Sequence, residues 1–176
     1  MTEQAETFIN SSVEPGQPDR VASEDPASHG LRRRVSQYWR LPTNPFDKIG
    51  YSNHLGRAKM FKLLEQRGIH ITRAMFANYM AKGALPPPVD GRSYTHWHVA
   101  LLALIDWLKH MYSIDELAMV LKRVEPLPVG ELWRVMPASA DDPVPDNDEA
   151  LSVLMLMIKT ECTRRAIICC LASDTQ

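Results

Sequence analysis

The sequence predicts a mainly α-helical protein with one small β-hairpin, and three observations support this prediction. Apolar residues recur at helical spacing in five segments between positions 53 and 171. Residues that favour helix N-termini stand before three of these segments, at Thr72, Thr95 and Ser113. The turn dipeptide formed by Asp90 and Gly91 follows a run of three prolines and predicts the hairpin.

The composition is that of a globular protein with one main domain. The chain has 176 residues, of which 45% are hydrophobic and 23% are charged, and this length allows one domain with appendages rather than two full cores. We expect five segments: a disordered acidic tail (1–30), a basic and aromatic lead-in (31–50), a central domain (51–123), a linker (124–147) and a C-terminal helix (148–172).

Charge is unevenly distributed along the chain, although the net charge is only -1. Residues 1–30 contain one basic and six acidic residues. Residues 31–123 contain fifteen basic and six acidic residues, and residues 124–176 contain four basic and nine acidic residues. A basic middle between acidic ends is expected if only the middle meets phosphates. The alternative is an ordinary solvated basic face flanked by acidic tails.

Several classes of protein do not fit the sequence. No secretory signal is visible, and the most apolar run, at 151–158, is too short to span a bilayer. The three cysteines do not form a disulfide framework, so we expect a cytoplasmic protein. The chain has no glycine-rich phosphate loop, no zinc-ligand spacing and no nucleophile beside a base, so we expect neither an enzyme nor a bound cofactor or metal.

The first two structured segments are basic. In the lead-in, arginines at 32–34 precede Tyr38 and Trp39, and we favour an amphipathic segment whose aromatic side chains dock on the core. An arm that lies on phosphates is the alternative. The helix predicted at 53–67 has a basic polar face, formed by Arg57 and its neighbours, and Gly68 is its expected C-terminal cap.

The helix predicted at 72–82 has two different faces. At about 100° per residue, Arg73, Asn78 and three alanines fall within an arc of about 140°. The opposite arc is apolar and anchors the helix. Alanines permit close approach to a major groove, while Arg and Asn side chains match guanine and adenine edges. Helix packing against the alanines is the alternative.

A stiff connection follows this helix. Prolines at 86–88 stop the helix, and Val89 can pair with Ser93 and Tyr94 in a very small hairpin that carries Arg92 at its tip. A proline-recognition ligand is the less favoured alternative. The next helix, 95–110, is apolar all round and marks the centre of the domain. Ser113 then opens a helix with a capping box.

The last predicted helix, 148–171, is too apolar to stand alone. It must pack on the domain or on its twin in a second copy of the chain. Cys162, Cys169 and Cys170 lie in this helix. We expect them to act as small apolar residues, with a thiol sensor or soft-metal site as the alternative.

Motifs in the central domain resemble a known group of proteins. These motifs are Asn78 with Tyr79, Lys82 with Gly83, the prolines at 86–88, Arg92 with Tyr94, and the cap at 113–116. Their order resembles the winged helix-turn-helix of the MerR family of bacterial transcriptional regulators. It is more similar to the domain of unknown function 1836 (DUF1836) family, over residues 51–123.

The resemblance implies a mainly α fold, a MerR-like winged helix-turn-helix with a small β wing and a C-terminal helix of the dimerisation type. It implies a homodimeric regulator that binds double-stranded DNA, with the second helix in the major groove and the wing on the backbone. The DNA-binding residues implied are Thr72, Arg73, Asn78, Tyr79, Lys82, Arg92 and Tyr94. The alternative is a protein-interaction module on the same scaffold that does not bind DNA.

Overall fold

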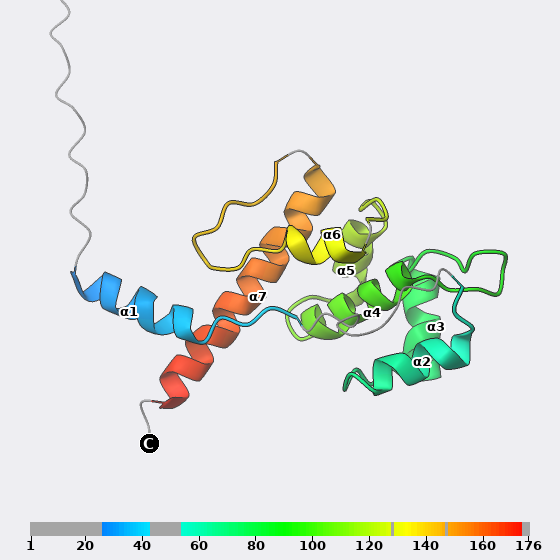
Figure 1. The fold of residues 1–176 in the computed structure, drawn as a ribbon, viewed down its shortest axis with the longest axis horizontal. Coiled ribbons are helices and arrows are strands. Elements are labelled where there is room, and N and C mark those ends of the chain that lie inside the picture. Colours follow the sequence, from blue (N-terminus) through cyan, green and yellow to red (C-terminus); the bar gives the residue numbers. More distant parts are fainter. Residues whose placement is uncertain (1–25, 43–53, 128, 147, 174–176) are drawn as a thin grey trace, which may run out of the picture.

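The computed structural model describes residues 26–42, 54–127, 129–146 and 148–173. Over these residues the chain forms helices joined by loops, and two isolated β-bridges provide the extended pairing (Figure 1). The helices are α1 (Pro26–Gln37), α2 (Arg57–Glu65), α3 (Arg73–Lys82), α4 (His96–Leu108), α5 (Ile114–Leu121), α6 (Val129–Arg134) and α7 (Glu149–Ser173). The prediction of a mainly helical protein is therefore confirmed.

Helix α4 forms the centre of the molecule. All but two of its residues are buried, as the continuous apolar run predicted. It packs against α2, α5, α6 and α7, so these five helices share one core. In Figure 1, α2 and α3 lie at one end of the molecule, while α1 crosses α7 at the other end.

Local hydrogen bonds fix the helix ends that the sequence predicted. The Met75 amide donates to Thr72 Oγ1 over 3.1 Å at the start of α3, and Gly83 ends this helix with a left-handed φ of 76°. At α5, the Ser113 amide donates to Glu116 Oε2 and the Glu116 amide donates to Ser113 Oγ, which completes the predicted capping box.

Helix α1 begins earlier than predicted. Residues 26–30, which were expected in the disordered tail, form its first turns, and residues 1–25 lie outside the described part of the chain. The indole of Trp39 is buried, Tyr38 Oη donates to Ser173 Oγ over 3.0 Å, and the arginines at 32–34 are exposed. The predicted docking on the core is confirmed for Trp39, while half-buried Tyr38 contacts the last residue of α7.

The segment predicted as a linker takes part in the core. Leu132 of α6 is fully buried, and Trp133 Nε1 donates to the Pro42 carbonyl over 3.2 Å. The segment therefore packs on the rest of the chain through these two side chains.

Helix α7 packs on its own chain. It contacts α1, α4 and α5, and its N-terminus is capped by Asp148, whose Oδ1 accepts from the Leu151 amide over 2.9 Å. Its outward side still exposes apolar residues, among them Leu156 and Leu171. Neither α7 nor any other helix in the described segments is long and apolar enough to cross a bilayer.

Candidate nucleic-acid interface

The two faces of α3 divide as the helical angles predicted. The exposed residues are Arg73, Ala74, Ala77, Asn78, Ala81 and Lys82. Phe76 and Tyr79 are buried, and Met75 and Met80 are half-buried on the same side. The helix thus presents a strip of small side chains that is edged by an arginine and an asparagine.

A chain of aromatic contacts holds α3 in place. Phe61 of α2, Phe76 of α3, Tyr94 of the hairpin and His98 of α4 meet edge to face, with ring centroids 5.4, 5.5 and 5.3 Å apart. Such pairs stabilise by about 0.5–1.5 kcal/mol each beyond the area they bury. The orientation of α3 is therefore fixed relative to both neighbouring helices and to the hairpin.

His98 connects the proline run to α4. The Thr95 amide donates to His98 Nδ1 over 3.0 Å, so Nδ1 is the acceptor and Nε2 carries the proton, 3.4 Å from the Pro87 carbonyl. Burial lowers the pKa of His98 and outweighs the opposite effect of the carbonyls of Pro87 and Pro86. The ring is therefore neutral at pH 7, and it takes the capping place that glutamate usually fills.

The hairpin is formed by backbone hydrogen bonds on either side of two residues in the left-handed conformation. The Ser93 amide donates to the Val89 carbonyl over 2.9 Å, and the Val89 amide donates to the Ser93 carbonyl over 2.7 Å. Asp90 and Gly91 have φ of 53° and 68°, which accounts for this Asp-Gly pair in the turn. Arg92 is exposed beside them, as predicted, but the pairing consists of isolated bridges rather than strands.

An arginine that the sequence reasoning did not single out stands opposite α3. Arg57, in the first turn of α2, lines a groove of about 330 Å³ together with Arg73, Ala77 and Met80. Its guanidinium donates to Tyr94 Oη over 3.4 Å. The sequence showed Arg57 only as part of a basic helix face, because its position beside Arg73 depends on tertiary packing.

Several of the implied DNA-binding residues have other partners. Tyr79 and Tyr94 are 6% and 2% exposed, so their rings pack in the core and do not have the surface position that the resemblance implied. Thr72 caps α3 with its hydroxyl, and Lys82 Nζ lies 2.7 Å from Asp115 Oδ1. Thr72 and Lys82 are nevertheless exposed, so the implied residues that remain on the surface are Thr72, Arg73, Asn78, Lys82 and Arg92, and Arg57 adds an exposed arginine beside them.

No metal site accompanies this surface. Within the described ranges, no three His, Cys, Asp or Glu side chains are grouped so that they could hold a metal ion. His96 lies near Lys59, whereas His98 lies at the carbonyls of Pro87 and Pro86.

Comparison with known proteins concerns the part of the chain that carries this surface. No curated protein and no solved structure matches the chain. Residues 54–126 contain ten basic and six acidic side chains and include α2, α3, α4, α5 and the hairpin. This segment matches the family model described as a domain of unknown function, DUF1836, and the candidate interface therefore belongs to a region that is similar to that family.

Proposed function

We propose that residues 54–126 bind double-stranded DNA and that the protein is a cytoplasmic transcriptional regulator. In this proposal α3 enters the major groove, and the hairpin around Arg92 lies on the sugar-phosphate backbone as a wing, in the manner of a MerR-like winged helix-turn-helix. The observation that carries the proposal is the exposed face of α3, in which alanines separate Arg73 from Asn78.

The chemistry of this face suits base edges. The alanine side chains at 74, 77 and 81 are exposed and small, so the helix backbone can approach the floor of a groove. Arg73 lies in the first turn of α3, where recognition helices contact bases, and arginine pairs with guanine through two hydrogen bonds. Asn78 offers the donor and acceptor pair that matches adenine.

In this proposal two further arginines contact the phosphates of the DNA backbone. Arg57 shares the groove beside Arg73, and Arg92 is exposed at the tip of the hairpin. Contacts of this kind position a protein on DNA without reading the sequence. Lys82 contributes less in this proposal, because its ammonium is partly neutralised by Asp115.

A homodimer through α7 is part of the proposal. The outward side of α7 exposes Val153, Leu156, Ile167, Ile168 and Leu171, each 39–60% exposed. A second copy that covers these side chains would remove apolar surface from water. Two α3 helices in one dimer would then read two half-sites.

The experiment is a binding titration with duplex DNA. We expect the fluorescence anisotropy of labelled random and promoter-derived duplexes to report binding that weakens steeply as salt rises. Arg92→Ala should weaken binding to all sequences alike and reduce the salt slope by about one. Arg73→Ala should instead relax the preference among sequences.

The matched control is Arg134→Ala on α6, which removes a 75%-exposed arginine side chain outside residues 54–126. This variant should bind as the wild type does. Absence of duplex binding at low salt, or an equal loss in Arg134→Ala, would contradict the proposal.

A protein-interaction module is the second candidate function, and one observation favours it. With both tyrosines buried and Lys82 paired, the exposed face of α3 is mostly alanine, which also suits packing against another helix. Binding of a protein partner through this face would change little with salt, and duplex DNA would not compete.

A further inference from the structure

The buried imidazole of His98 lies where the proline run, the hairpin and α4 meet. It is 2% exposed, its ring meets the Tyr94 ring at 90° with centroids 5.3 Å apart, and its Nε2 is 3.4 Å from the Pro87 carbonyl. Tyr94 also joins the hairpin to the chain before α2, because its carbonyl accepts from the Leu55 amide over 2.7 Å and its amide donates to the Leu55 carbonyl over 2.8 Å. The imidazole therefore holds the base of the hairpin against α4.

This contact requires a neutral imidazole. The Thr95 amide donates to His98 Nδ1 over 3.0 Å, so a proton on that nitrogen would leave the amide facing a second donor. Thr95 Oγ1 lies 2.9 Å from the same nitrogen and can accept the new proton, but the amide would still lose its acceptor. Protonation of His98 therefore breaks the capping box at the start of α4.

The groups around His98 do not compensate a positive charge. The charged and titratable groups on the neighbouring elements are Arg57 and Lys59 on α2, Tyr94, Asp90 and Arg92 on the hairpin, and His96 on α4. Arg57 donates to the Tyr94 hydroxyl, and Lys59 lowers the pKa of His96. The one carboxylate in this set is exposed at the turn of the hairpin. A charge on the buried ring would thus lack a counter-charge, which favours its release to water.

We infer that protonation of His98 detaches the base of the hairpin from α4 while the rest of the fold stays intact. The inference rests on the buried ring at the junction, on the amide that donates to it and on the absence of a carboxylate beside it among the groups named above. It does not depend on DNA binding. If the hairpin is the wing of the proposed DNA interface, its release would also move Arg92 away from the DNA backbone.

The size of the effect follows from proton linkage. In the detached state His98 faces water and regains its ordinary pKa of 6.5, whereas burial lowers its pKa in the folded state. The detached population is therefore nearly constant well above pH 6.5 and rises as pH falls below 6.5, until pH reaches the lowered pKa. Between pH 7.5 and 5.5 the rise is at most about tenfold, because only one proton is taken up.

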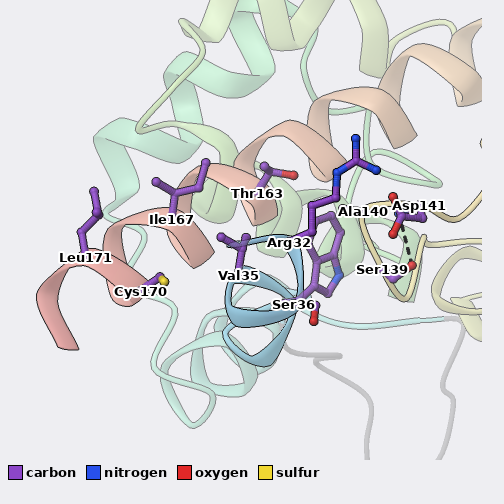
Figure 2. A pocket seen from close by; sticks show the side chains of 11 residues that line it. Arg32, Val35, Ser36, Ser139, Ala140, Asp141, Thr163, Ile167, Cys170 and Leu171 are labelled. Atoms are coloured by element: carbon purple, nitrogen blue, oxygen red, sulfur yellow. Dashed lines mark hydrogen bonds between the residues drawn. The ribbon is translucent and has the colours of Figure 1, made fainter. Parts of the chain in front are cut away.

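Amide hydrogen exchange of the full chain, measured by NMR at pH 7.5 and 5.5, tests the inference. Protection factors, corrected for intrinsic exchange, should fall severalfold, and at most about tenfold, at the amides of Leu55 and Ser93, which donate to Tyr94 and Val89. The amide of Ile167 on α7 is the internal reference. It lies beside the apolar cavity between α1 and α7, where none of the lining side chains that Figure 2 shows is a histidine, and it should keep its protection.

Two glutamine variants separate His98 from general effects of acid. His98→Gln keeps an acceptor at the third position of α4, where glutamine completes a capping box, but it cannot take up a proton. The fall in protection at Leu55 and Ser93 should then be less than about twofold. His96→Gln removes the other buried imidazole of α4 and should keep the wild-type dependence on pH.

Thermal unfolding shows whether each variant folds, and the ring protons of His98 in the wild type provide a readout that needs no variant. Their NMR titration should follow the shift of the Arg92 amide. Unchanged protection of Leu55 and Ser93 between the two pH values would overturn the inference, as would a dependence that persists in His98→Gln or disappears in His96→Gln. An equal loss of protection at Ile167 would mean that acid unfolds the whole chain, which would also overturn it.

Discussion

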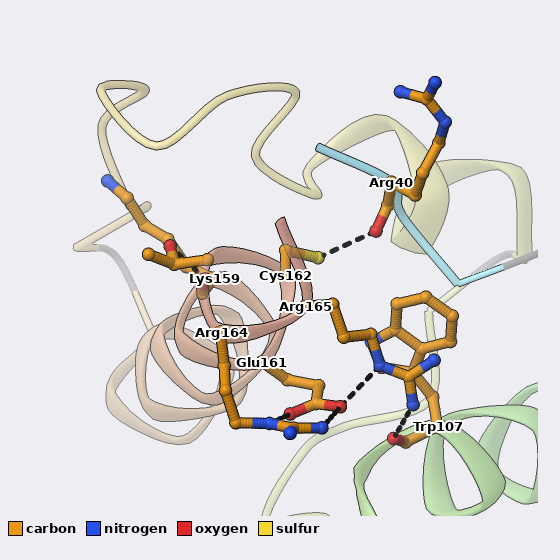
Figure 3. A network of polar contacts seen from close by, with 8 residues as sticks. Arg40, Trp107, Lys159, Glu161, Cys162, Arg164 and Arg165 are labelled. Carbon is orange, nitrogen blue, oxygen red and sulfur yellow. Dashed lines mark hydrogen bonds and ion pairs between the residues drawn. The ribbon is translucent and has the colours of Figure 1, made fainter. Parts of the chain in front are cut away.

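Replacement of Glu161 by glutamine should destabilise the protein far more than the same change at Glu131. The side chain of Glu161 is fully buried, and its carboxylate accepts hydrogen bonds from Arg164 Nε (2.7 Å) and Arg165 Nε (2.5 Å) (Figure 3). Arg165 also lies 3.7 Å from the centroid of Trp107 and donates to the Trp107 carbonyl, so this network joins α7 to α4. Glu131 makes a similar contact with Arg134, but both side chains are largely exposed.

The magnitude follows from the loss of a charged acceptor. A hydrogen bond to a charged group contributes about 1.5–3 kcal/mol and a neutral one about 0.5–1.5 kcal/mol, so glutamine at a site with two arginine partners costs about 2 kcal/mol. The arginine side chains are 41% and 33% exposed, so they regain water when the carboxylate is lost, and the larger cost of a stranded buried charge does not apply. Glu131→Gln should cost about 0.5 kcal/mol or less.

Chemical and thermal unfolding measure the stability of both variants, and a loss of about 2 kcal/mol should lower Tm by about 4–8 °C.

The effect of Glu161 should also depend on pH. Burial raises the pKa of Glu161, but the hydrogen bonds from Arg164 and Arg165 lower it more, so the net shift is downward. A lowered carboxyl pKa stabilises the fold above the usual value of 4.5, and this stabilisation is lost as pH falls through the lowered pKa. Wild type and Glu161→Gln should therefore converge in strong acid. Equal costs for Glu161→Gln and Glu131→Gln at pH 7 would refute the reasoning.

Three other perturbations test single features of the fold. Gly83→Ala should cost about 1 kcal/mol in unfolding experiments, because φ is 76° there, whereas Gly30→Ala, inside α1 and outside the left-handed region, should not destabilise; neither added methyl group meets an atom within 4 Å. Ser113→Ala should cost about 1 kcal/mol through loss of the cap of α5, and an unchanged denaturation midpoint would contradict this role. Burial raises the pKa of Cys162 to about 11, so iodoacetamide at pH 8 should modify the exposed Cys169 and leave Cys162 unmodified in a mass spectrum of the folded protein.

Features that depend on neighbouring residues could be predicted from the sequence. The N-terminal caps at Thr72 and Ser113 occur where expected, because each satisfies backbone groups within three residues. The turn at Asp90 and Gly91 forms for the same reason, since φ above zero is a local requirement. The two faces of α3 followed from helical periodicity alone.

Features that depend on distant residues could not be predicted in this way. The burial of Tyr94 follows from its contacts with Phe76 and His98, and a tyrosine in a short hairpin carries no sequence signal that separates an inward ring from an outward one. Arg57 and Arg73 share a groove only because α2 and α3 pack through their phenylalanines. The cavity between α1 and α7 joins segments more than a hundred residues apart.

A single carboxylate on α3 provides the most direct test of the proposed DNA interface. Ala77 is exposed at the centre of the α3 face, so Ala77→Glu should fold normally and yet lose duplex binding by at least about tenfold at low salt, because the new charge faces phosphates. Ala172→Glu makes the same exposed change near the end of α7 and should bind as the wild type does. If the folded Ala77→Glu variant binds duplex DNA as tightly as the wild type, α3 does not contact DNA and the central claim is wrong.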